Sequence, residues 1–71
     1  MMKTEKSVII IGTNTAALRA GRLLGSDGVR SKVIRRTSSG SGCVYGVEID
    51  SIDLNTAIYI FRRNNIQFAL I

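Results

Sequence analysis

The sequence contains no histidine, no proline and no tryptophan, and it contains one cysteine. Without histidine, the usual zinc sites and the histidine-based catalytic triads cannot be built, and no metal site is expected. A single cysteine cannot form a disulfide within the chain, so its thiol is free. No hydrophobic leader is visible, and no apolar run approaches the ~20 residues that a membrane-spanning helix needs. We therefore expect a cytoplasmic protein without a membrane anchor.

The chain has 71 residues, of which 45% are hydrophobic. This length predicts one small domain over residues 1–71, which buries roughly 60% of the surface of the unfolded chain. Ten basic and five acidic residues give a net charge of +5. Such a charge favours anionic partners in general without identifying one.

The first third of the chain reads as a strand followed by a helix. Residues 7–11 are a β-branched run that is typical of a strand. Gly12 follows, and then Thr13, Asn14 and Thr15, whose residue types favour a turn or a helix N-cap. From residue 16 onward, the apolar residues Ala17, Ala20 and Leu24 recur at the spacing of one helix face. The glycines after residue 24 are expected to end this helix.

Three further strands are predicted. Residues 29–37 form the second, and its basic residues Lys32, Arg35 and Arg36 are typical of an edge strand. Residues 44–49 alternate between an apolar and a mixed face and predict the third strand. Residues 66–71 form a short fourth strand at the end of the chain.

A second helix is expected between the third and fourth strands. Asp50 is predicted to cap it, with Asp53 near the positive end of the helix dipole. Asn64 and Asn65 are expected to end it. The predicted buried stripe consists of Leu54, Ala57, Ile58 and Phe61.

The resulting order is strand, helix, strand, strand, helix, strand, which is the split βαβ pattern of ferredoxin-like α+β domains. This pattern predicts a four-stranded, antiparallel-dominated sheet of order 4-1-3-2, with both helices on one face. A right-handed crossover makes the second strand parallel to the first. The hairpin after the second strand and the start of the first helix are therefore expected at the same end of the sheet.

The only cysteine, Cys43, follows a segment of small residues, TSSGSG, in this hairpin. At the start of the first helix, free backbone N–H groups and the helix dipole favour an anion, and a thiolate is the reactive form of cysteine. The residues expected around the sulfur are Gly12, Thr13, Asn14 and Thr15 from the helix start and Ser39, Gly40, Ser41 and Gly42 from the loop. The alternative is a hairpin loop in which Cys43 is incidental.

The segments TNTAALRAGRLL and SSGSGCVYGVEID, with a basic strand between them, resemble the selenium/sulfur carrier-like family of small bacterial domains. The resemblance covers nearly the whole chain. It implies that Cys43 carries sulfur or selenium as a persulfide or a related species, and that donor and acceptor proteins are its partners. Val44 departs from the family pattern, in which glycine commonly follows the cysteine. Other persulfide-relay proteins use a Cys-Pro motif, which this chain lacks.

Two functions remain open at this point. The first is a thiol carrier rather than a turnover enzyme, because no second residue is placed as a general base. The second is a non-covalent module that binds an anionic small molecule or a partner protein in the same loop pocket, with Cys43 incidental.

Nucleotide and nucleic-acid binding are not expected. The turn after residue 11 has one glycine, Gly12, where a dinucleotide fingerprint needs three at set spacing, so no cofactor is predicted. Tyr45 and Tyr59 lack basic companions at the spacing of a base-stacking surface. The only feature that favours a nucleic-acid partner is the positive net charge.

The first strand is apolar on both faces, with Val8 and Ile10 on one and Ile9 and Ile11 on the other. Two helices cover only one face of a four-stranded sheet, so the other face needs a different cover. We expect a symmetric homodimer that packs these faces together. The rival cover is a heterologous partner.

Overall fold

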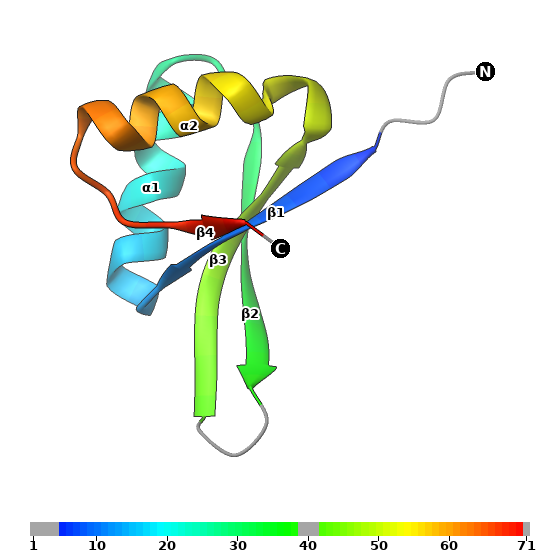
Figure 1. Ribbon diagram of the computed structural model, residues 1–71, viewed down its shortest axis with the longest axis vertical. Coiled ribbons are helices and arrows are strands. Elements are labelled where there is room, and N and C mark those ends of the chain that lie inside the picture. The colour runs from blue at the N-terminus through cyan, green and yellow to red at the C-terminus, as the bar shows by residue number, and fades with distance from the viewer. Residues whose placement is uncertain (1–4, 39–41, 71) are drawn as a thin grey trace.

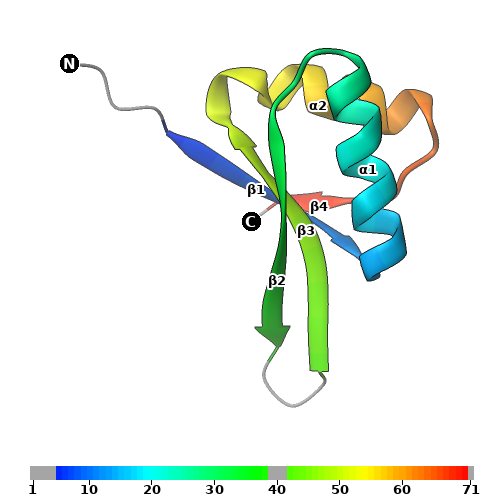
Figure 2. The same cartoon turned by 180° about the vertical axis from the view of Figure 1, so that it is seen from behind.

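The computed structural model describes residues 5–38 and 42–70. Its elements are β1 (Lys6–Gly12), α1 (Asn14–Ser26), β2 (Ser31–Ser38), β3 (Gly42–Asp50), the 3₁₀ helix η1 (Ser51–Asp53), α2 (Leu54–Arg63) and β4 (Ala69–Leu70). The strands form one sheet of order β2-β3-β1-β4, and every neighbouring pair is antiparallel. Both helices lie on the same side of this sheet (Figure 1, Figure 2). The predicted ferredoxin-like fold and its strand order are confirmed.

The hydrophobic core lies between the sheet and the two helices. On the sheet side, Ile9, Val47 and Ile49 are fully or almost fully buried. The helices contribute Ala20, Leu24, Ala57, Ile60 and Phe61, which pack in the same cluster. Among the described helices, none is long and apolar enough to cross a membrane.

The start of α1 is set by Thr13, as its residue type predicts. The Thr13 Oγ1 accepts a hydrogen bond of 3.1 Å from the backbone N–H of Ala16, which satisfies one of the free donors of the first turn. The helix therefore begins at Asn14, two residues before the first apolar position. Further along, a Cβ atom on Gly21 would lie 3.4 Å from the Ser31 Oγ and 3.6 Å from the Val33 Cγ2, so α1 packs against β2 at this position.

The start of α2 differs from the prediction. Asp50 makes no capping hydrogen bond, because its carboxylate pairs with the Lys6 ammonium on β1. The 3₁₀ turn η1 comes next, and α2 begins only at Leu54.

The buried stripe of α2 is also different from the predicted one. Ala57, Ile60 and Phe61 are buried, whereas Ile58 is half-buried. The reason is that α2 packs against α1 as well as against the sheet, which turns Ile60 toward the core. At its end, Asn65 has a left-handed φ of 57°, so the predicted termination at the two asparagines is confirmed.

Two strands are shorter than predicted because helix ends take up their first residues. Val29 donates its N–H to the Leu24 carbonyl, so β2 begins at Ser31. Ile66 donates its N–H to the Phe61 carbonyl, so β4 is reduced to Ala69–Leu70. Ile71, predicted in this strand, lies outside the described residues.

Candidate functional site

The β2–β3 hairpin projects beyond the rest of the sheet (Figure 1, Figure 2). β1 pairs with β3 only from Asp50 to Tyr45, which lies opposite Gly12. Beyond Tyr45, β3 continues to Gly42 and pairs only with β2. The end of this ribbon therefore has a strand on one side only.

Cys43 lies on the projecting part of β3, opposite Thr37, and it is exposed with a free thiol. It is two residues beyond Tyr45, which is about 7 Å along an antiparallel strand. Gly42, just before it, has a φ of 89°, a backbone conformation that glycine adopts readily. The predicted loop residues Ser39, Gly40 and Ser41 lie outside the described residues.

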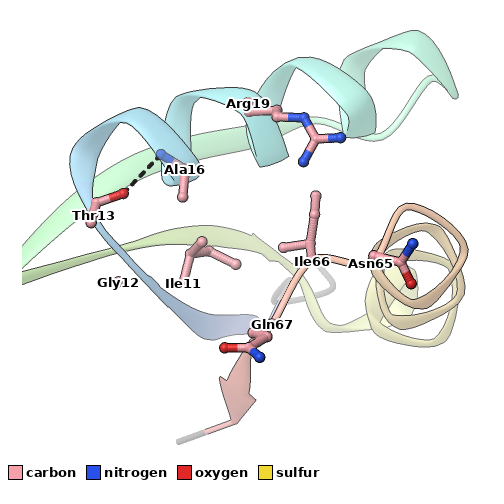
Figure 3. A pocket seen from close by; sticks show the side chains of 8 residues that line it. All are labelled: Ile11, Gly12, Thr13, Ala16, Arg19, Asn65, Ile66 and Gln67. Carbon is pink, nitrogen blue, oxygen red and sulfur yellow. Dashed lines mark hydrogen bonds between the residues drawn. The ribbon is translucent and has the colours of Figure 1, made fainter.

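Gly12 and Thr13 line a hollow of about 320 Å³ at the start of α1 (Figure 3). The residues around it are Ile11, Gly12, Thr13, Ala16, Arg19, Asn65, Ile66 and Gln67. Asn14 and Thr15, exposed in the first turn of α1, do not line it. Cys43 is not among the lining residues either, so the hairpin and the helix start share one end of the sheet without sharing this hollow.

Sequence reasoning missed Arg19 as a member of this hollow. Ala16 and Arg19 are three residues apart, which places them on the same side of a helix. This spacing was the sequence signal that could have placed Arg19 beside the start of α1. Asn65 and Gln67 enter the hollow from the connection between α2 and β4. No sequence signal placed this connection beside the start of α1.

A basic side chain accompanies Cys43 across the ribbon. Thr37 pairs with Cys43 and Arg35 pairs with Tyr45, so Arg35 is the diagonal cross-strand neighbour of Cys43. Diagonal neighbours on one face of an antiparallel pair are about 7–8 Å apart, within reach of a long side chain. Arg35 is exposed and can approach an anionic group on the Cys43 sulfur.

The site shows no candidate metal centre within residues 5–38 and 42–70, where no three potential ligands gather. Its chemistry is that of one exposed thiol beside a basic side chain, Arg35, with a separate hollow of mixed polar and apolar lining at the start of α1. No protein-family model matches the sequence, and comparisons with curated proteins and with solved structures find no similar protein.

Proposed function

We propose that this protein is a thiol carrier in which Cys43 accepts a sulfur or selenium atom from a donor and passes it to an acceptor protein. The observation that carries the proposal is the exposure of Cys43 on a ribbon that projects beyond β1. A donor can reach a thiol in this position without any rearrangement of the core. The resemblance of the SSGSGCVYGVEID segment to the selenium/sulfur carrier-like family supports the same function.

The transfer step needs no oxidant. The Cys43 thiolate attacks the outer sulfur of a persulfide on the donor, a new S–S bond forms, and the donor thiolate leaves with the electron pair of the broken S–S bond. The product is a persulfide on Cys43. Attack by an acceptor thiolate on the outer sulfur then regenerates the Cys43 thiolate. Each step exchanges one S–S bond for another, so neither is a net oxidation or reduction.

Arg35 supports this chemistry by its charge. A persulfide is anionic once deprotonated, and a guanidinium within reach stabilises an anion through charge-assisted hydrogen bonds. Because Arg35 is the diagonal cross-strand neighbour of Cys43, we expect it to stabilise the anionic persulfide that results.

Loading with glutathione persulfide, followed by intact-mass measurement, tests the proposal. We expect the wild-type protein to gain the mass of one sulfur atom, and an added thiol acceptor to remove it. Cys43→Ser should gain none. Arg35→Gln should load several-fold more slowly, whereas Arg19→Gln, which removes the same charge from α1, should load at the wild-type rate. Loading of Cys43 no faster than free cysteine, or a persulfide that no thiol can remove, would overturn the proposal.

The hollow at the start of α1 favours a second candidate, the binding of a small anion without covalent chemistry. Thr13, Arg19 and Gln67 border it, and they can donate hydrogen bonds to an oxyanion. In an NMR titration with inorganic phosphate, this function predicts shifts at Gly12 and Thr13 that Arg19→Gln abolishes and Cys43→Ser preserves. Cys43→Ser and Arg19→Gln therefore distinguish the thiol carrier from the anion-binding protein.

A further inference from the structure

β2 is a long edge of the sheet whose outer side is open. Within residues 5–38 and 42–70, it pairs only with β3, along all eight of its residues. Along the half of β2 that leads into the hairpin, neither view shows a helix or strand on its outer side (Figure 1, Figure 2). The backbone N–H and C=O groups of a strand point alternately to its two sides, so an edge strand offers a row of donors and acceptors to an added strand.

The charge of this edge is of one sign. Lys32, Arg35 and Arg36 are exposed, and β2 contains no acidic residue. Lys32 lies opposite Glu48 of β3, whereas the residues opposite the two arginines are uncharged. Neither arginine forms a salt bridge in the part of the chain that the structure describes. The edge therefore carries positive charge that β3 does not neutralise.

A second copy of the chain does not fit this edge. Two identical antiparallel strands related by a two-fold axis are centred on one residue, and directly opposed residues are equally far from it. A pairing centred on Ile34 sets Lys32 opposite the partner's Arg36, and one centred on Lys32, Arg35 or Arg36 sets that basic residue opposite its own copy. The centres at residues 31 and 33 set Arg30 opposite Lys32 and Arg36. Like charges directly opposite each other destabilise a strand pair, so each of these registers is disfavoured.

We infer that the outer edge of β2 binds an extended acidic peptide, which adds to the sheet as a strand antiparallel to β2. Val33 lies opposite a buried residue of β3, so Lys32, Ile34 and Arg36 lie on the face opposite the helices and Arg35 lies on the helix face. A peptide that places acidic residues opposite Arg36, Arg35 and Lys32, in this order along its own chain, has the pattern acidic-acidic-apolar-any-acidic. Its apolar residue then lies opposite the half-buried Ile34.

The peptide site goes beyond the carrier function and does not rest on it. The peptide is held by the backbone and the basic side chains of β2, whereas the carrier needs the thiol of Cys43. Arg36 also lines a hollow with Val8, and because its side chain is exposed it can turn toward a carboxylate at the edge. Since Arg35 serves both proposals, peptide binding is best measured in a protein without the thiol.

Titration of isotope-labelled Cys43→Ser protein with the peptide TSEEVTETS, blocked at both ends, tests the inference by NMR. We expect the largest shifts at the amides of residues 32–36. Lys32→Gln and Arg36→Gln, each combined with Cys43→Ser, should weaken binding by about two- to fivefold, as expected for the loss of one opposite-charge pair across strands. Arg62→Gln, which removes the same charge from α2, is the matched control and should leave binding unchanged.

Two N-methylated forms of the peptide, one methylated at odd and one at even positions, test the backbone pairing. Only one of these sets of N–H groups faces β2 in an added strand, so one form should lose binding and the other should keep it. Equal binding of both forms would overturn the inference, as would equal binding of TSKKVTKTS, in which lysines replace the glutamates. An oligothymidylate that shifts the same amides and is not displaced by the acidic peptide would assign the edge to nucleic acid instead. Failure of the acidic peptide to bind would contradict the peptide site alone, because persulfide loading of Cys43 is measured separately in the wild type.

Discussion

At Gly46 of β3, the backbone of β1 occupies the place that a side chain would take. Gly46 is buried, it pairs with Ile10, and a Cβ atom placed on it would lie 2.4 Å from the Ile9 carbonyl oxygen and 3.1 Å from the Ile10 Cα. Both neighbours are backbone atoms of a paired strand, so they cannot rotate away as a side chain would. Only glycine fits at this crossing without moving β1.

We predict that Gly46→Ala destabilises the protein by roughly 1–3 kcal/mol, the usual penalty of an overpacked site. Urea denaturation measures this change. Gly25→Ala is the control, because a Cβ there meets no atom within 4 Å, and alanine in a helix is favoured by up to about 1 kcal/mol over glycine. Equal stabilities of the two variants would contradict the close crossing.

At the scale of elements, the start of β1 is tied to the end of β3 by side chains as well as by the strand ladder. Lys6 pairs with Asp50, and the Ser7 and Ser51 hydroxyls lie 2.7 Å apart. The Ser51 N–H also donates to the Glu5 carbonyl at 2.8 Å. These contacts hold η1 against β1 and explain why the Asp50 carboxylate is not available as a helix cap.

The Lys6–Asp50 pair predicts a pH dependence of stability. The hydrogen bond to Asp50 raises the pKa of Lys6 above its ordinary value of 10.5. A group whose pKa is raised by folding stabilises the native state below the unfolded-state pKa, and this contribution is lost as the pH rises through the native-state pKa. The urea midpoint of the wild type should exceed that of Lys6→Met at neutral pH, and the two should converge in strongly alkaline solution. A difference that does not change with pH would show that packing, not charge, is responsible.

At the scale of the whole molecule, one aromatic residue joins the parts of a small core. Phe61 is fully buried in the cluster that contains residues of the sheet and of both helices. Its ring lies 5.6 Å from that of Phe68, centroid to centroid, at an interplanar angle of 51°. A tilted pair at this distance is a favourable aromatic geometry. Through its contact with Phe68, Phe61 therefore holds the segment before β4 against the core.

We predict that Phe61→Ala lowers the free energy of unfolding by about 3–5 kcal/mol, because it leaves a cavity between the sheet and the helices. A domain this small should then unfold. Tyr59→Ala, which removes an aromatic ring that is 63% exposed on the same helix, should change the stability little. Thermal denaturation followed by circular dichroism compares the two. A Phe61→Ala protein as stable as the wild type would contradict the position of α2.

The order of the elements and the strands was determined by the sequence itself. Three local signals predicted the elements: the spacing of the apolar residues, Thr13 as a helix cap and the two asparagines after residue 63. Each of them depends only on residues a few positions away, so the rest of the fold does not change it. The same signals place Cys43 in the hairpin just before the third strand. In the structure it lies within β3, because the ladder with β2 continues to Gly42.

What only the tertiary structure decided were the features that depend on distant partners. The Asp50 carboxylate pairs with Lys6, which is far away in sequence, and is therefore not free to cap a helix. Packing of α2 against α1 turns Ile60 toward the core. The length by which the hairpin passes β1 depends on where β1 stops pairing, at Tyr45. For the same reason, the hollow that joins Arg19 to Gln67 was not foreseeable, since its walls come from two segments that are brought together only when both helices pack on one face of the sheet.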